Sequence, residues 1–138
     1  METIHVAAAV IENNNQILAA KRADIDGENA WEFPGGKVEL AEGSEGALRR
    51  EVREELGCEL QLILPFDTIE FDYPDFHLSM DVFICTLAPK QEPEAKVHAE
   101  LKWVSKDELT EVAWLAADQI AAYKLGMFWD MYFSEQHL

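Results

Sequence analysis

Apolar and polar positions change their spacing several times along the chain, and each spacing predicts a different element. Apolar runs at residues 5–11 and 16–21 flank three asparagines, which predicts two strands joined by a hairpin turn. Residues 23–30 mix acidic residues with glycine and have no period, so we expect an exposed loop there. The Pro-Gly-Gly segment at 34–36 then predicts the end of any regular element.

A helical spacing follows between Ser44 and Leu56. Apolar Leu48, Val52 and Leu56 recur four residues apart and share one helix face. Ser44 is placed to cap the first turn, and Gly57 is placed to end the helix. The segment 44–56 is therefore predicted to be an amphipathic helix.

The second half of the chain returns to strand patterns before it ends in a helix. We expect strands at 59–64 and 68–72, and a strand at 77–87 whose unbroken apolar run predicts burial on both faces. A turn at 73–75 separates the last two of these.

The rest of the chain is predicted to alternate loop, strand and helix. Residues 88–97 contain two prolines and are expected to form a loop, and 101–104 is expected to be a short strand. Ser105 and Glu108 have the spacing of a capping box, and 116–133 is expected to be one terminal helix. Strands and helices in this order predict an α/β fold with a mixed sheet between helices.

Length and charge narrow the classes of function. The chain has 138 residues, 49% of them apolar, which suits one domain over 1–138 with a core that needs no disulfide or structural metal. Its 27 acidic and 11 basic residues give a net charge of -16, which argues against binding to nucleic acid polymers or anionic membranes. The excess acid either serves solubility or clusters to hold divalent cations.

The cysteines and the N-terminal residues predict a cytoplasmic protein. Cys58 and Cys85 each lie among apolar neighbours and are expected to be buried free thiols. The chain opens without a basic leader, and no apolar run reaches the length of about 18 residues that a membrane span needs.

Three glutamates stand together on the predicted helix. Glu51, Glu54 and Glu55 occupy positions i, i+3 and i+4, so their carboxylates project from nearly one face. They either hold a metal ion or form a solvated acidic face in which Arg50 pairs with Glu54. Helix geometry alone does not separate these two interpretations.

The spacing of the residues around these glutamates favours the metal interpretation. Residues 36–58 read Gly-x5-Glu-x7-Arg-Glu-Val-x-Glu-Glu-x-Gly-Cys. This series matches the Nudix box position by position, with Cys58 as a small apolar residue in the last place. The chain therefore resembles the Nudix hydrolases, and within them the MutT-like and CTP-type nucleoside triphosphate pyrophosphohydrolases. The resemblance implies a Nudix-type α/β/α sandwich with a mixed central sheet.

The resemblance also implies a metal centre. By this likeness Mg²⁺, or Mn²⁺ in its place, would be held by the following groups: the carbonyl of Gly35 and the carboxylates of Glu51, Glu54 and Glu55. Arg50 would fix the glutamates through ion pairs. Glu51 would activate the attacking water, with Glu54 as the alternative base, and Glu42 would order the loop.

The implied substrate is a small nucleotide. In MutT-like enzymes water attacks the β-phosphorus and releases a nucleoside monophosphate and pyrophosphate. Lys37 and Arg22 would contact phosphates, although Arg22 fits equally well as a surface arginine. Phe33 would be an aromatic wall or a core residue, and Asp118 would meet the base edge or cap the last helix. The protein would act as a monomer or a homodimer.

Two positions depart from the pattern. The glutamate that MutT-like proteins often carry six residues before Trp103 is Val97 here, with Glu94 and Glu100 as the nearest acids. Phe76 stands where the oxidised-guanine enzyme has a cation, which favours a pyrimidine or a broader specificity. The alternatives are an ADP-ribose or other nucleoside diphosphate pyrophosphatase, and a noncatalytic nucleotide-binding domain.

Overall fold

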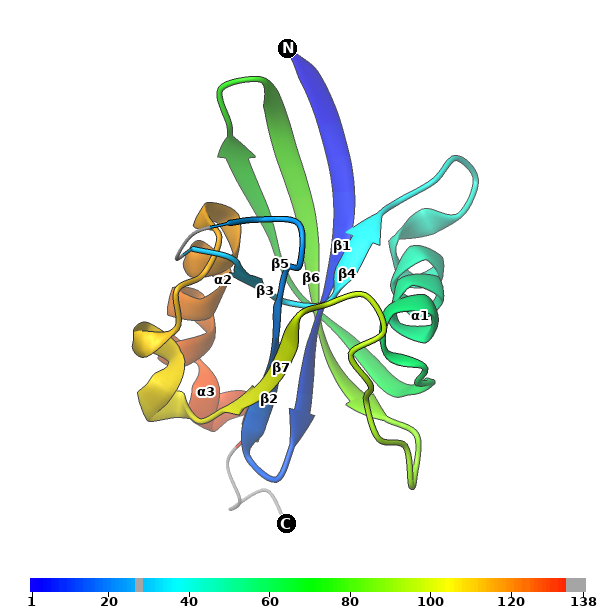
Figure 1. The fold of residues 1–138 in the computed structure, drawn as a ribbon, viewed down its shortest axis with the longest axis vertical. Helices are drawn as coiled ribbons and strands as arrows, with labels where there is room; N and C mark the ends of the chain where they lie inside the picture. Colours follow the sequence, from blue (N-terminus) through cyan, green and yellow to red (C-terminus); the bar gives the residue numbers. More distant parts are fainter. Residues whose placement is uncertain (27–28, 134–138) are drawn as a thin grey trace.

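A mixed sheet between two helical layers organises the chain, whose computed structural model describes residues 1–26 and 29–133 (Figure 1). Its elements are β1 (Glu2–Asn13), β2 (Gln16–Lys21), β3 (Trp31–Glu32), β4 (Gly35–Lys37), α1 (Gly43–Leu56), β5 (Leu60–Asp72), β6 (Phe76–Leu87), β7 (Glu100–Val104), the 3₁₀ helix η1 (Lys106–Glu111), α2 (Ala116–Met127) and α3 (Trp129–Phe133). The sheet order is β3-β2-β1-β6-β5, with β4 also paired to β1 and β7 to β2. Because β1 and β6 run parallel and the other pairs run antiparallel, the predicted α/β fold with a mixed sheet is confirmed.

The predicted hairpin joins β1 to β2. Asn14 and Asn15 turn the chain with φ values of 51° and 63°, in the left-handed region that asparagine tolerates better than most residues. Two consecutive residues with positive φ match the twist of the flanking strands. The hairpin therefore forms as the asparagine run predicted.

Two strand predictions were wrong. Gly35–Lys37 does not end regular structure but forms β4, which pairs antiparallel with Val6–Ala8 of β1. The two strands expected at 59–64 and 68–72 are one strand, β5, whose register with β6 shifts between Pro65 and Asp67. Proline lacks a donor N–H, and a bulge in an edge strand accommodates it without ending the strand.

Helix α1 packs the predicted apolar stripe against one face of the sheet. Leu48, Val52 and Leu56 are fully buried, together with Cys85 of β6. Gly57 ends the helix as expected, with a φ of 69°.

The predicted cap of this helix was wrong. Glu42 is the N-cap, although its side chain makes no capping hydrogen bond, and the helix begins at Gly43. The hydroxyl of Ser44 instead donates to the carboxylate of Asp81 on β6, so it ties the helix to the sheet. The Ser44 hydroxyl, which local spacing assigned to capping, thus bonds instead to Asp81, a residue distant in the sequence.

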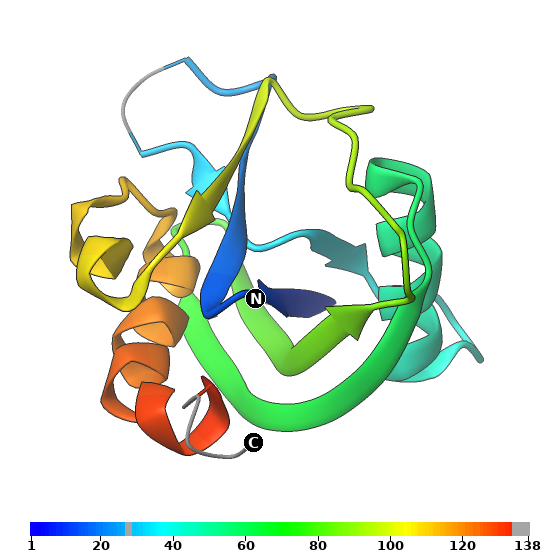
Figure 2. The same ribbon diagram turned by 90° about the horizontal axis from the view of Figure 1, so that it is seen from below.

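Helices α2 and α3 cover the opposite face of the sheet, as Figure 2 shows from below. The single helix expected over 116–133 is interrupted at Phe128, which ends α2. The break lets Trp129 turn inward, where it is 1% exposed and packs against Phe133 at 4.8 Å between ring centroids. The capping box of Ser105 and Glu108 forms at η1 as predicted.

Strand β6 is buried on both faces, as its apolar run predicted. Met80, Val82 and Ile84 belong to the core beneath α2, while Cys85 belongs to the core beneath α1. Cys58 and Cys85 are buried free thiols. In the described ranges, no helix is both long and apolar enough to cross a membrane.

Candidate active site

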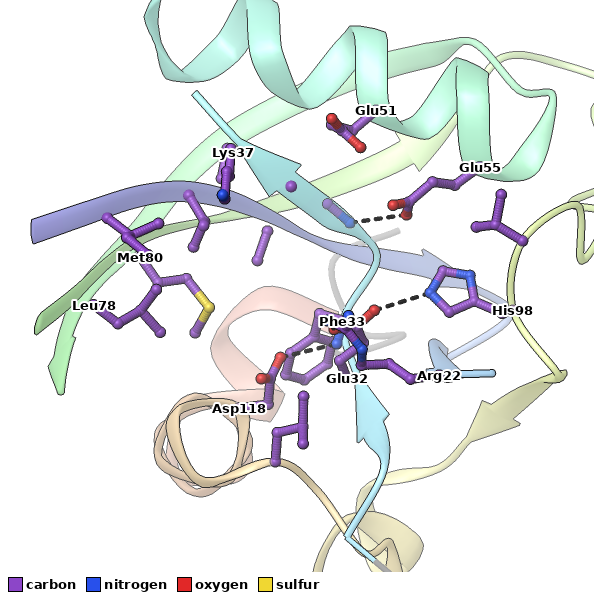
Figure 3. Close-up of a pocket in the computed structure, with 18 of the residues that line it drawn as sticks. Arg22, Glu32, Phe33, Lys37, Glu51, Glu55, Leu78, Met80, His98 and Asp118 are labelled. Carbon is purple, nitrogen blue, oxygen red and sulfur yellow. Dashed lines mark hydrogen bonds and ion pairs between the residues drawn. The ribbon is translucent and has the colours of Figure 1, made fainter. Parts of the chain in front are cut away.

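One cavity of about 800 Å³ gathers most of the residues that the sequence singled out (Figure 3). Those lining it are Arg22, Phe33, Gly35, Lys37, Glu51, Glu55 and Asp118. They come from the end of β2, the β3–β4 segment, α1 and α2. Arg50 and Glu54 do not line the cavity. The volume lies within the range of about 300 to 1,000 Å³ that is usual for small-molecule sites.

Strand β4 brings two glycines against the elements that flank it. Gly35 has a φ of 153°, and a Cβ there would lie 2.0 Å from the carbonyl oxygen of Ala7. A Cβ on Gly36 would lie 2.4 Å from the carboxyl carbon of Glu51. Gly35 therefore leaves no room for a side chain against β1, and a side chain at Gly36 would displace the Glu51 carboxylate.

Arg50 fixes the loop and the glutamates from outside the cavity. Its guanidinium donates to Glu42 at 2.7 and 3.0 Å, to the carbonyl of Lys37 at 3.1 Å and to Glu51 at 2.8 Å. A longer bond of 3.4 Å reaches Glu54. Glu42 also accepts from the backbone of Glu39, so it orders this loop. Arg50 thus holds Glu51 toward the cavity.

Glu55 is the most perturbed acid of the helix. One of its oxygens accepts a hydrogen bond of 3.3 Å from the Gly35 N–H. Burial raises the pKa of Glu55, the charge of Glu51 raises it further, and His98 opposes both. Glu54, whose side chain is 59% exposed, faces solvent instead. The two glutamates of α1 at the cavity are therefore Glu51 and Glu55.

These residues fit a divalent cation that also contacts a substrate. Among the described side chains, no three His, Cys, Asp or Glu groups converge closely enough to hold a metal by themselves. Glu51 and Glu55 nevertheless supply two carboxylates beside the Gly35 backbone. The charges of Glu51 and Glu32 both raise the pKa of Glu55, so a cation in this corner would relieve their repulsion. Mg²⁺ typically uses one or two carboxylates and completes its ligands with substrate phosphates and water.

Two cations, Arg22 and Lys37, lie in the wall of the cavity. Arg22 donates to Asp24 at 2.8 and 2.6 Å and to Glu32 at 3.5 Å, and its side chain is 40% exposed. These bonds hold the pKa of Arg22 above its usual range. Lys37 lies exposed at the end of β4. Arg22 is therefore a partly exposed residue of the cavity wall that two carboxylates hold in place.

Phe33 and Asp118 form the end of the cavity beside α2. Phe33 is 3% exposed and stacks on Trp114 with 4.6 Å between ring centroids, so it belongs to both the core and the cavity wall. Asp118 accepts a 3.0 Å hydrogen bond from the Phe33 N–H. It does not cap α2, whose N-cap is Leu115, so that alternative was wrong. Burial raises the pKa of Asp118 to about 7.

The sequence did not single out Glu32 or His98 for the site. His98 is a buried loop residue of the cavity wall, and its Nε2 lies 2.9 Å from a carboxylate oxygen of Glu32. The signal that could have found it is its place beside Val97, the position at which the resemblance to MutT-like proteins implies a glutamate. Glu94 and Glu100, the nearest acids to that position, are exposed and lie outside the cavity wall.

The burial of Asp118 predicts a specific pH dependence of stability. Its ordinary pKa is about 4, so between pH 4 and 7 the folded chain binds one more proton than the unfolded chain. This contribution to stability is complete below pH 4 and is lost as pH rises through 7. Asp118→Asn keeps an acceptor for the Phe33 N–H. At pH 8 its free energy of unfolding should exceed that of wild type by on the order of 2 to 4 kcal/mol.

Urea denaturation at several pH values measures this difference. The gap between Asp118→Asn and wild type should shrink as pH falls from 8 to 4. Asp75→Asn, the same exchange at an exposed position, is the control and should show no such trend. A gap that does not change with pH would contradict a buried, proton-binding Asp118.

A helix with two glutamates, a glycine strand and two cations thus meet at one cavity of this α/β fold. The NUDIX domain family model matches residues 1–132. The chain belongs to this family and is a Nudix hydrolase.

Individual relatives agree with this assignment. The 8-oxo-dGTP diphosphatase of Proteus vulgaris is 39% identical over 85 residues, which cover 60% of this chain and 76% of that protein. The CTP pyrophosphohydrolase of Escherichia coli K12 is 53% identical over 60 residues, which cover 43% of this chain and 44% of that protein. The solution structure of the E. coli ORF135 protein matches with a TM-score of 0.82 and 30% identity, over 98% of this chain and 96% of that one.

Proposed function

We propose that this chain hydrolyses nucleoside triphosphates, ordinary or modified, to a nucleoside monophosphate and pyrophosphate with Mg²⁺. The observation that carries the proposal is the convergence in one cavity of Glu51 and Glu55, two cations and the buried Asp118. Figure 3 draws the glutamates and Asp118 on opposite sides of the cavity, which gives a phosphate end and a base end. The relatives named for 8-oxo-dGTP and CTP support the same substrate class.

At the phosphate end, the chain's own groups can position the substrate and accept a proton. Mg²⁺ held by Glu51, Glu55 and the Gly35 carbonyl would neutralise phosphate charge and lower the pKa of a bound water. Arg22 and Lys37 bind phosphate oxygens. Glu51, held by Arg50, accepts the proton of the attacking water. The bond from water oxygen to the β-phosphorus forms while the bond to the bridging α–β oxygen breaks.

At the base end, the cavity offers apolar walls and one polar group. Phe76, Leu78 and Met80 line it from β6, and Phe76 stacks on Tyr73 at 5.0 Å between centroids. Asp118 as a carboxylate accepts a hydrogen bond from an exocyclic amine, such as that of cytosine or guanine. These contacts favour a base that carries an amine and a flat apolar face.

A substrate panel tests this proposal. The protein is incubated with ordinary, oxidised and methylated nucleoside triphosphates and with ADP-ribose, and the products are resolved by chromatography. We expect monophosphate and pyrophosphate from at least one triphosphate, loss of turnover in EDTA, and recovery with Mg²⁺ or Mn²⁺. Release of inorganic phosphate, cleavage of ADP-ribose alone, or nucleotide binding without product would refute it.

A further inference from the structure

His98 is a buried polar residue of which only one ring nitrogen has a hydrogen-bond partner among the described residues. Its side chain is 3% exposed, on the loop before β7. Because a carboxylate only accepts hydrogen bonds, the Nε2 of His98 donates to Glu32. The Nδ1 atom is buried and has no partner within the described chain. A buried polar atom without a hydrogen bond disfavours folding, so His98 costs stability at Nδ1 while its Nε2 serves Glu32.

A chain of polar contacts connects His98 to Arg22 through Glu32. Glu32 uses one oxygen for His98 and the other for Arg22, at 2.9 and 3.5 Å. The second partner of Arg22 is Asp24, which accepts at 2.8 and 2.6 Å, and because its side chain is 65% exposed, solvent screens this pair. Figure 3 shows Arg22, Glu32 and His98 together on one side of the cavity. Arg22 is therefore anchored from its buried side by Glu32.

We propose that His98 is a positioning residue for the triphosphate chain of the nucleotide. It fixes the carboxylate of Glu32, and Glu32 in turn directs the Arg22 guanidinium toward the phosphates. This inference rests on the proposed function, because it takes Arg22 as a phosphate-binding group. Both His98 and Glu32 are shielded from solvent, with side chains 3% and 16% exposed, and a shielded hydrogen bond holds its partner more firmly than one in water.

Two amide variants separate the ring nitrogens of His98. In His98→Gln the new side-chain amide can donate from near the former Nε2 position, whereas in His98→Asn the shorter side chain places the amide nearer the former Nδ1. We expect His98→Asn to raise KM about tenfold with little change in kcat, since a misaligned binding group costs this order of affinity. His98→Gln should recover most of the affinity. His5→Gln, the same exchange at an exposed residue outside the cavity, is the control.

A double-mutant cycle tests the path through Arg22. The effect of His98→Asn on KM should vanish in an Arg22→Ala background, because the group that His98 positions is then missing. The proposal would be overturned if the effects of His98→Asn and Arg22→Ala on KM multiplied in the double variant. It would also be overturned if His98→Gln and His98→Asn lost affinity equally. If His98→Asn does not fold, Glu32→Gln is the substitute, because it disrupts the contacts that join His98 to Arg22. Glu32→Gln should then raise KM about as much as we expect for His98→Asn.

Binding measurements distinguish this inference from the proposed function. Calorimetry with Mg²⁺ and the α,β-methylene analogue of dCTP gives a Kd for each variant without turnover. If wild type binds the analogue but releases no product from any triphosphate, only the proposed reaction fails, and the Kd values still decide the role of His98. If wild type neither binds nor hydrolyses triphosphates, both proposals are overturned.

Discussion

Glu51→Gln is expected to lower kcat by at least about a hundredfold, the usual contribution of a positioned general base. Glutamine keeps the shape of the side chain but neither accepts a proton from water nor supplies a carboxylate to a cation. The fold should persist, because Glu51 lies at the cavity and the helix is anchored by Leu48, Val52 and Leu56. Glu55→Gln should cause a comparable loss, since Glu55 is the second cavity carboxylate of the helix.

Steady-state rates, with circular dichroism to verify folding, measure these losses. Glu45→Gln is the matched control, because Glu45 is exposed on the same helix and pairs only weakly, at 3.4 Å, with Arg49. Glu54→Gln should lose less than Glu51→Gln, as Glu54 faces solvent. Wild-type rates in both Glu51→Gln and Glu55→Gln would show that the reaction does not occur at these glutamates.

Gly35→Ala is expected to destabilise the fold by on the order of 3 kcal/mol or more. The new Cβ would lie 2.0 Å from the Ala7 carbonyl oxygen, and the backbone φ of 153° is strained for any L side chain. Backbone atoms form the obstacle, so a rotamer change does not relieve it. Strand β4 would have to separate from β1, which would also displace the Gly35 N–H from Glu55.

Thermal and urea unfolding measure this effect, and we expect a fall in Tm of about 10 °C or more. Gly126→Ala provides the matched control in α2, where a Cβ would meet only Leu109, at an ordinary contact distance of 3.6 Å. Alanine favours a helix over glycine by up to about 1 kcal/mol, so this variant should be neutral or slightly stabilised. Equal stabilities of the two variants would contradict the close approach at β4.

Local patterns succeeded where neighbours in sequence decide the structure. The asparagine turn after β1 and the Gly57 stop of α1 depend on the φ angles of single residues, so short stretches of sequence predict them. The apolar stripe of α1 likewise follows from helical periodicity. Patterns failed where a distant partner intervened, as when Asp81 engaged Ser44 and β1 paired with Gly35–Lys37.

The sequence alone determined the family likeness, the mixed α/β fold and the two cavity glutamates, because the box spacing is read along one strand, one loop and one helix. Tertiary structure alone decided that Glu54 faces solvent, and it brought the Phe33 N–H to Asp118, 85 residues away. It also joined Glu32 to His98 across 66 residues. No periodicity encodes such contacts, because they arise only when the sheet and both helical layers pack together.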